Sequence, residues 1–279
     1  MQAKNASRTA LAAAYLRAAH QIIDLEPRVL EDTIALRLLG RDAEDRIRAS
    51  TSKYMSPEAK ALRSHVVLRS RYAEVQLESS IERGISQYVL VGAGFDTFAL
   101  RQPRWAAGLK VVEVDHPDTQ RLKREYISNA GIAVPGNVVY AGVDFEHESL
   151  EEGLTRVGIG FDKPTFFSWL GVTMYLTEVA IDSTLRCMAV FPRGSEAVIT
   201  FLQPPVAQSA AARELAERVS EVGEPFVSYF TPDGFKEKLL ATGFSEVHLL
   251  TPELSARFFT EGASSLPNPS RVSITSAIV

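Results

Sequence analysis

Residues 87–97 read QYVLVGAGFDT, and this stretch decides the fold class. A short apolar run of β-forming residues is broken by two glycines, and a segment of helix length follows. Runs of the same kind recur at 109–115, 137–145, 164–170 and 196–202, again with helix-length segments between them. Such alternation is typical of a parallel sheet with right-handed crossover connections. The sequence therefore predicts a doubly wound α/β fold.

The chain before this stretch is helical in character. Apolar residues recur at helical spacing over 8–24, and a short helical segment follows at 31–40. A long helix is expected to begin at Ser56, a favourable N-cap that precedes a proline, and to end near Gly84. This region precedes the first strand, so it cannot supply a crossover helix of the sheet.

The chain after the fifth apolar run completes the pattern. Thr231, followed by a proline, and Gly243 are suited to begin and end a helix. Strands are expected at 246–250 and within 271–279, and the stretch GASSLPNPS at 262–270 reads as a surface loop.

Composition limits the function classes. The chain has 279 residues, a net charge of −4 and a pI of about 5.8, which disfavours a polyanionic partner such as nucleic acid. No apolar run approaches the roughly 20 residues that a membrane span needs. The single Cys187 cannot form an internal disulfide or a multi-cysteine metal site, which suits the cytoplasm. We expect a cytoplasmic enzyme whose partner is a small acceptor or a peptide.

The first twenty-three residues leave two interpretations open. They are rich in alanine, carry Lys4, Arg8 and Arg17, and contain no acidic residue, which is compatible with a transit peptide. The helical spacing of Leu11, Tyr15 and later apolar residues favours a structural helix.

Ligands of open parallel sheets bind beyond the carboxyl ends of the strands, so the polar residues there are the candidates. Gly92 and Gly94 permit a tight turn and a close approach of the backbone to a ligand. Any strand-to-helix turn can use such glycines, so the pair alone is weak evidence for a ligand-binding site. Thr97 replaces the third glycine of the dinucleotide fingerprint, and Asp96 stands where a pyrophosphate would lie. A carboxylate there favours a cationic ligand.

The next two strands also end in acids. Asp115 lies about twenty residues beyond the glycines and could accept hydrogen bonds from a ribose, or it could cap the following helix. Asp144 could accept a bond from an adenine amine, with Phe145 against the ring, or it could cap a helix of its own. Together with the glycine turn, these residues describe a nucleoside pocket better than each does alone.

The sequence resembles the leucine carboxyl methyltransferase family of class I methyltransferases, especially its bacterial small-molecule branch, which is similar to polyketide O-methyltransferases. The motifs are VLVGAGFDTFALR, VVEVDHPDTQRLKRE, GVDFE and SWLGVTMYLTE, and the resemblance covers roughly residues 60–250. It implies a seven-stranded, Rossmann-like core at 85–279, an N-terminal helical lid at 1–84, S-adenosylmethionine as cofactor, and methyl transfer to oxygen.

The family's binding residues can be placed on this chain. By resemblance, Gly92 and Gly94 match the glycine turn, Asp115 the ribose acid, and Asp144 with Phe145 the adenine contact. Arg69 matches the arginine that binds the carboxylate of the cofactor, a task that suits a guanidinium fork. Arg71, two residues later, is a weaker candidate for this carboxylate-binding role. Either arginine could instead lie on a solvated helix face.

One position departs from the family. Leu170 stands where the family usually has a glutamate, five residues before the tyrosine of the fourth-strand motif. The methionine end of the cofactor must then be held otherwise, and Ser168, Trp169 and Thr173 are the candidates. The replacement leaves the acceptor side of the site undefined.

Other chemistry finds little support in the sequence. The histidines show no metal-ligand spacing and no evident pairing with an acid, and no nucleophile elbow or phosphate-binding loop occurs. The expected reaction is O-methylation of a small-molecule hydroxyl or carboxyl without an identified catalytic side chain or metal. The alternatives are carboxyl methylation of a protein C-terminus and non-catalytic nucleoside binding. The sequence supports a nicotinamide oxidoreductase less than these alternatives. It does not give the oligomeric state.

Overall fold

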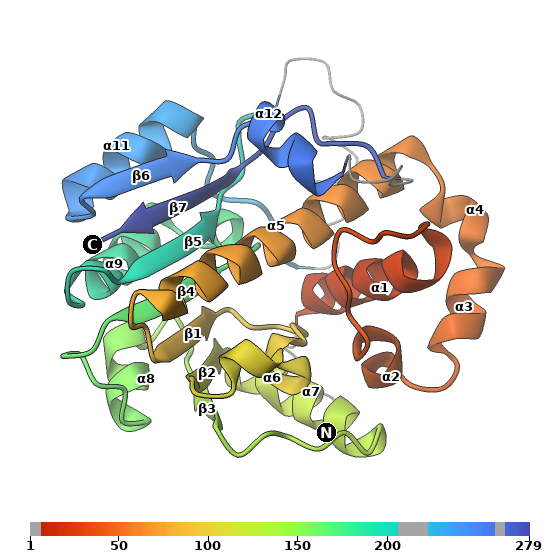
Figure 1. Cartoon of the computed structure of the whole chain (residues 1–279), viewed down its shortest axis with the longest axis horizontal. Helices are drawn as coiled ribbons and strands as arrows, with labels where there is room; N and C mark the ends of the chain where they lie inside the picture. The colour runs from red at the N-terminus through yellow and green to blue at the C-terminus, as the bar shows by residue number, and fades with distance from the viewer. Residues whose placement is uncertain (1–6, 206–222, 260–265) are drawn as a thin grey trace.

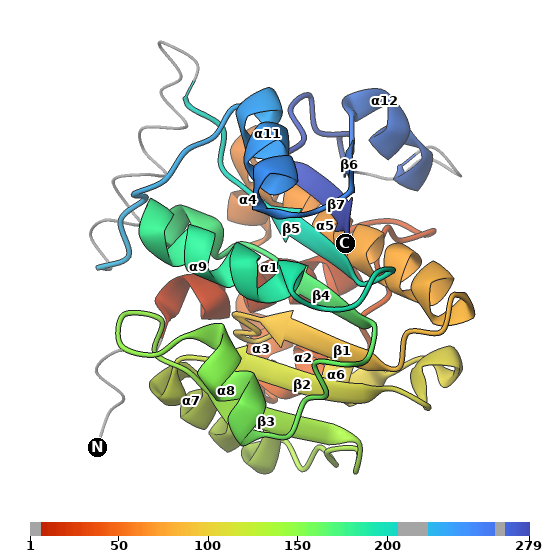
Figure 2. The same cartoon turned by 90° about the vertical axis from the view of Figure 1, so that its left-hand side faces the viewer.

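The seven expected strands form one sheet in the computed structural model, which describes residues 7–205, 223–259 and 266–279. Their order across the sheet is β3-β2-β1-β4-β5-β7-β6, which Figure 2 shows from one edge to the other. The strands are β1 Gln87–Val91, β2 Lys110–Asp115, β3 Val138–Gly142, β4 Thr165–Trp169, β5 Glu196–Thr200, β6 Glu246–Leu249 and β7 Ile274–Ile278.

The direction of the last strand differs from the rest. Strands β1 to β5 pair in parallel, as predicted, whereas β7 lies antiparallel between β5 and β6. The order reverses at β1, from which the chain builds outward first through β2 and β3 and then through β4 and β5. Ligands of open α/β sheets bind beside such a reversal, at the carboxyl ends of the strands.

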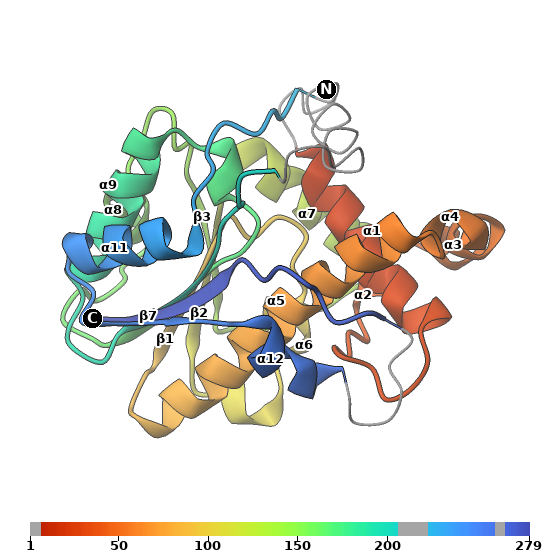
Figure 3. The same ribbon diagram turned by 90° about the horizontal axis from the view of Figure 1, so that it is seen from above.

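Apolar side chains cover both faces of the sheet, as buried parallel strands require. On one face, inward residues such as Val89 and Phe167 pack with α8, α9 and α11. On the other face, Tyr88 and Phe166 pack with α5 and α6. Figure 3 shows these helix layers on opposite sides of the sheet. The helices are α5 Pro57–Glu82, α6 Phe98–Arg101, α7 Pro117–Asn129, α8 Leu150–Arg156, α9 Glu178–Ala189 and α11 Pro232–Thr242.

Four helices precede the long α5 and form a third apolar cluster with Phe95 and the end of α7. They are α1 Arg8–Ile23, α2 Ala35–Leu39, α3 Ala43–Ala49 and α4 Thr51–Tyr54. Figure 1 shows them together at one side of the molecule, with α5 running from them to the sheet. The structural interpretation of 8–24 is therefore confirmed, and we call α1–α4 the lid helices.

Local signals set the helix ends as expected. Ser56 caps α5 and accepts a hydrogen bond from the Ala59 N–H, and Thr231 caps α11 in the same way. Gly243, at φ +122°, ends α11. The structure adds short elements that no pattern indicated, among them α3, α4, α12 Pro252–Ser255 and the 3-10 turns Arg104–Ala106, Thr173–Tyr175 and Ala256–Phe258. The expected loop at 262–270 lies partly outside the described residues.

Within the described part of the chain, none of the helices combines the length and apolar character that a membrane span requires.

Candidate functional site

The glycine turn follows β1 at the carboxyl edge of the sheet. Gly92 has φ +66°, a conformation that favours glycine, and a Cβ there would overlap the side chain of Val172. The Ala93 N–H donates to the Val114 carbonyl over 3.0 Å, which ties the turn to β2. Glycine is therefore required at position 92 by its positive φ and by the close packing of Val172 against the turn.

Asp115, at the end of β2, binds the glycine turn directly. Its Oδ2 accepts a hydrogen bond from the Gly94 N–H, and its Oδ1 accepts one from the His116 N–H over 2.7 Å. The cap of α7 is His116, whose Nδ1 accepts from the Asp118 N–H, so the capping interpretation of Asp115 is wrong. Burial raises the pKa of Asp115, although both backbone N–H groups act against this rise. Each oxygen keeps a second lone pair for a ribose hydroxyl.

Glu113, two residues earlier, has a structural role. It is buried and accepts a hydrogen bond from Lys123 over 2.7 Å. Its burial and its ion pair with Lys123 indicate that Glu113 stabilises the packing of α7 against β2.

Asp144 follows β3 and lies beside the ring of His116. Its Oδ1 accepts from the Glu146 N–H over 3.1 Å, and its Oδ2 lies 3.6 Å from the His116 Nε2. The cap of α8 is Ser149, which forms a capping box with Glu152, so Asp144 is not the cap of that helix. The adjacent Phe145 is partly buried against the sheet core. The structure thus brings Gly94, Asp115, His116 and Asp144 into one chain of contacts.

Arg69 and Arg71 occupy opposite environments on α5. Arg71 is exposed, whereas Arg69 is half-buried and lies over Gly171, where an added Cβ would overlap its guanidinium. No hydrogen-bond or ion-pair partner occurs for Arg69 among the described residues. Burial and the positive charge of Arg17 lower the pKa of Arg69 to about 10. A half-buried guanidinium with no partner in the described part of the chain indicates a site for an anion.

Asp96 supplies the opposite charge at the same place. Its Oδ1 accepts from the Phe98 N–H over 2.7 Å, while no bond to its Oδ2 occurs within the described residues. Burial raises the pKa of Asp96, but the positive charges of Arg17, Lys123 and Arg101 outweigh this effect, and the pKa is lowered. Asp96 and Arg69 interact electrostatically. A carboxylate with a free oxygen beside an unpaired guanidinium is complementary to the ammonium and carboxylate of an amino acid.

The three candidates near Leu170 do not join this group. Ser168 is 3% exposed, and its hydroxyl is hydrogen-bonded to the Tyr88 hydroxyl over 2.8 Å. Trp169 is fully buried in the sheet core, and the Thr173 hydroxyl donates to the Thr200 carbonyl. We therefore leave Ser168 out of the proposed cofactor contacts. Leu170 itself packs into the apolar cluster on the α5 side of the sheet.

The first turn of α1 lies over the site, and the sequence did not indicate which residues of the N-terminal region make this contact. Ala10 packs on the glycine turn, because a Cβ at Gly94 would come within 3.0 Å of the Ala10 Cβ. Glu224 holds this turn by accepting from the Arg8 N–H over 2.8 Å and from the hydroxyls of Ser7 and Thr9. The first turn of α1 therefore lies on the glycine turn at the end of β1.

A family comparison agrees with this arrangement. The family model described as leucine carboxyl methyltransferase matches residues 10–189, which is well over half of the chain. The chain belongs to the leucine carboxyl methyltransferase family. It is an S-adenosylmethionine-dependent methyltransferase.

Relatives of this methyltransferase occur in several bacteria. YktD of Bacillus subtilis (strain 168), whose name describes an S-adenosyl-L-methionine-dependent methyltransferase, is 28% identical over 292 residues, 95% of either chain. A Parafrankia sp. (strain EAN1pec) protein with the same description, Franean1_4929, is 28% identical over 64% of this chain and 57% of its own.

Solved structures share the fold of this family member. A DUF574 family protein from Streptomyces avermitilis superposes with a TM-score of 0.59 at 15% identity, covering 96% of this chain and 95% of that one. A Thermobifida fusca protein described as a methyltransferase superposes with a TM-score of 0.53 at 18% identity, covering 87% of this chain and 91% of that one. The fold is therefore that of the class I methyltransferases.

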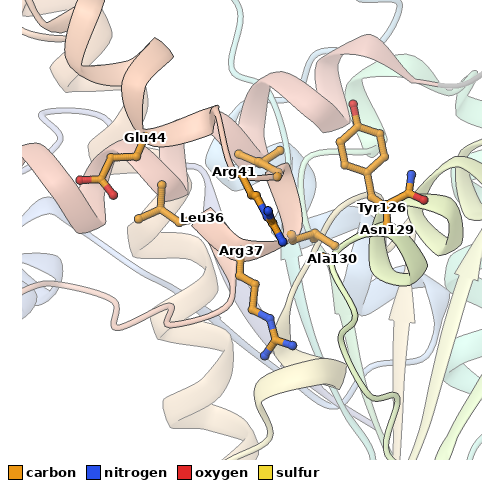
Figure 4. Close-up of a pocket in the computed structure, with 10 residues that line it drawn as sticks. Leu36, Arg37, Arg41, Glu44, Tyr126, Asn129 and Ala130 are labelled. Atoms are coloured by element: carbon orange, nitrogen blue, oxygen red, sulfur yellow. The ribbon is translucent and has the colours of Figure 1, made fainter.

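A surface pocket of about 540 Å³ lies apart from the strand ends of the methyltransferase. Figure 4 shows it between the α2–α3 turn, with Arg37 and Arg41, and the end of α7, with Tyr126 and Asn129. Arg37 donates to the Gly131 carbonyl over 2.6 Å. None of the proposed cofactor residues lines this pocket. Across the described residues, no group of histidine, cysteine or acidic side chains is arranged to hold a metal.

Histidines of the methyltransferase do contact acids, contrary to the sequence expectation. His20 is fully buried, with Nδ1 2.9 Å from the Asp24 Oδ2 and with Nε2 accepting from the Leu30 N–H. Two bonds of 2.6 and 2.8 Å join Asp24 to Arg63, so this cluster holds the lid together. The spacing of His20 and Asp24, four residues apart on a helix, was the signal that could have revealed the pair.

Proposed function

We propose that this enzyme transfers the methyl group of S-adenosylmethionine to an oxygen of a small molecule, a hydroxyl or a carboxyl. One observation carries the assignment of the site: Arg69, whose guanidinium has no partner among the described residues, interacts electrostatically with the Asp96 carboxylate near two strand-end acids. The pair fits the amino acid end of the cofactor, and Asp115 and Asp144 fit its ribose and adenine. A cytoplasmic location and a role in secondary metabolism belong to the same proposal.

The closed lid supports a small acceptor. Ala10 lies against Gly94, and Glu224 holds the first turn of α1 over the strand ends. A site that the first turn of α1 partly covers admits a small molecule more readily than a folded protein surface. Bound S-adenosylmethionine would supply the electrophilic methyl group. The chain's own contribution is to hold an acceptor oxygen in line with that methyl in a water-poor space.

We expect S-adenosylhomocysteine, the product of methyl transfer, to bind at micromolar strength and to raise the melting temperature. Ligand present at a hundredfold excess over its dissociation constant should add about 2.7 kcal/mol to the free energy of unfolding. Thermal denaturation with increasing S-adenosylhomocysteine measures this directly, and adenosine with free methionine serves as the control. Unchanged melting at millimolar S-adenosylhomocysteine would reject the assignment of the site.

The acceptor is expected to lose its proton without a dedicated histidine base. Both ring nitrogens of His20 are occupied within the lid. Burial, and then the charge of Arg69, lower the pKa of His65 to about 3, which makes its imidazole a weak proton acceptor. A carboxylate acceptor is already ionised at pH 7, and positive charge nearby can activate a phenol.

Single His→Ala variants of the five histidines should therefore lower turnover by no more than about tenfold, which is below the 10²–10⁴-fold range of general base catalysis. The assay uses saturating S-adenosylmethionine and an acceptor identified by screening phenols and carboxylic acids. Melting curves exclude unfolded variants, for which a His→Gln change is substituted. A hundredfold loss in one stably folded variant would identify that histidine as a base and contradict the mechanism.

A further inference from the structure

Arg17 is a buried arginine of the lid that reaches the back of the glycine turn. It lies on α1, and its side chain is 6% exposed. Its Nη2 donates to the carbonyl of Phe95, the residue between Gly94 and Asp96. Its Nε lies 3.4 Å from the Oδ2 of Asp32. The lid thus contacts the turn that carries the proposed ammonium-binding carboxylate.

Asp32 fixes the position of this arginine. It is buried at 1% exposure, and its carboxylate accepts from the Thr97 hydroxyl over 2.6 Å and from the Ala35 N–H over 2.9 Å. Thr97 begins α6 directly after the glycine turn. The Asp32 carboxylate therefore joins the start of α2 to the end of the turn and leaves little freedom to Arg17.

Stability alone does not account for this arrangement. Removing a guanidinium from water costs several kcal/mol unless good hydrogen bonds replace the lost solvation. Arg17 donates one hydrogen bond to the Phe95 carbonyl and forms one ion pair of 3.4 Å with Asp32. Its Nε has no hydrogen-bond partner in the described part of the chain. A buried charge with incomplete pairing is a candidate for a functional role.

The charge of Arg17 acts on both groups that face the amino acid end of the cofactor. It is the largest of the effects that lower the pKa of Asp96, so it favours the ionised form of that carboxylate. It also repels Arg69, which together with burial disfavours the charged form of the Arg69 guanidinium. A ligand carboxylate bound to Arg69 would offset this repulsion.

We propose that Arg17 is a positioning residue for S-adenosylmethionine, which holds the Phe95 carbonyl and adds positive charge behind Asp96 and Arg69. The lid is then part of the cofactor site and not only a cover for the acceptor. This inference rests on the cofactor site proposed above. It predicts that lid closure and cofactor binding are coupled, and such coupling must act in both directions.

The coupling has a pH signature. The contact between Asp96 and the ligand ammonium is present above the pKa of Asp96 and is lost as the pH falls through it. Burial raises the pKa of Asp96, and the charge of Arg17 is the largest effect that lowers it. Removal of Arg17 should therefore raise the pKa of Asp96. The other charged and titratable groups that interact with Asp96 come from α5, α6, α7 and the sheet: Arg69, Glu74, Tyr88, Arg101, Glu113 and Lys123.

The experiment measures S-adenosylhomocysteine binding by calorimetry at pH 7.5 and 5.0. Arg17→Met should weaken binding about tenfold at pH 7.5, within the range of coupling between residues of one network. The loss should be larger at pH 5.0, and Arg17→Lys, which keeps the charge, should lose less than Arg17→Met. Arg37→Met is the matched control, because Arg37 also joins the lid to a backbone carbonyl but lies away from the glycine turn.

A double-mutant cycle separates positioning from general destabilisation. If Arg17 acts through Asp96, Arg17→Met should have a much smaller effect in an Asp96→Asn background than in the unmodified protein. Hydrogen exchange supplies the reciprocal measurement, since S-adenosylhomocysteine should slow exchange across α1 in the unmodified protein and less so in Arg17→Met. Where Arg17→Met does not fold, the effects of Arg17→Lys and Asp32→Asn on binding are compared in the same two backgrounds instead.

The outcomes distinguish this inference from the proposed site. Binding that is unaltered by Arg17→Met at both pH values, while Asp96→Asn weakens it, would overturn the role of Arg17 alone. Equal losses in both backgrounds at both pH values would mean that Arg17 acts only through folding, which also overturns it. An unmodified protein that does not bind S-adenosylhomocysteine would overturn the cofactor site and this inference together.

Discussion

Arg69→Met should weaken S-adenosylhomocysteine binding by about 30-fold or more, which corresponds to the 2–5 kcal/mol lost when one member of a buried charge pair is removed. Arg71→Met should change binding by less than about twofold, because the Arg71 side chain is exposed on the opposite side of α5. Methionine keeps most of the apolar stem of each arginine, so the comparison isolates the guanidinium. Calorimetric titration of the three proteins measures the difference.

Arg69→Met should lower the affinity for S-adenosylhomocysteine but raise the stability of the ligand-free protein. The pKa of Arg69 is lowered to about 10 by burial and by Arg17, so its charged form is disfavoured in the folded state at pH 7. This penalty disappears only as the pH rises through the folded-state pKa. Arg69→Met should therefore raise the melting temperature without ligand while it lowers affinity, which is typical of residues kept for function.

Equal losses of affinity in Arg69→Met and Arg71→Met would contradict the assignment of Arg69. A lower melting temperature of ligand-free Arg69→Met would instead indicate a structural arginine. Gly171→Ala offers a further check, because a Cβ at this position would overlap the Arg69 guanidinium; Gly171 has φ +77°, so melting curves must accompany this variant to measure the backbone strain. It should reproduce a large part of the loss in affinity.

The sheet was predictable because its strands are short apolar runs bounded by turn residues. Caps such as Ser56 and Thr231 set helix ends by local hydrogen bonds, so they are visible in sequence. The antiparallel direction of β7 was not predictable, since it depends on the path of the preceding connection and not on the residues of the strand. Helix α3 was missed because its segment lacks a clear apolar periodicity.

The site was predictable where chemistry follows a strand end and not where it depends on distant contacts. Asp115 and Asp144 follow apolar runs, so the sequence places them at one edge of the sheet. Arg17 reads only as a basic residue of an alanine-rich helix, because its acceptor, the carbonyl of Phe95, lies 78 residues away. The hydroxyl of Ser168 suited a ligand by position, but its bond to Tyr88 requires the packed structure.

Asp115→Ala should weaken S-adenosylhomocysteine binding by about 1.5–3 kcal/mol, the scale of hydrogen bonds to a charged group. The structure adds a complication, because Asp115 also accepts from the N–H groups of Gly94 and His116. Loss of these bonds should lower the melting temperature and loosen the glycine turn. Affinity for one ligand therefore cannot separate ribose binding from support of the turn.

A ligand that lacks one ribose hydroxyl separates the two effects. The unmodified protein should prefer S-adenosylhomocysteine over its 2′-deoxy analogue, and Asp115→Ala should lose this preference because the acceptor of the hydroxyl is gone. Asp144→Ala, the matched control, should keep the preference, since Asp144 faces the adenine in our assignment. A loosened glycine turn would instead weaken both ligands equally, so a preference that survives in Asp115→Ala would show that Asp115 supports the turn and does not bind the ribose.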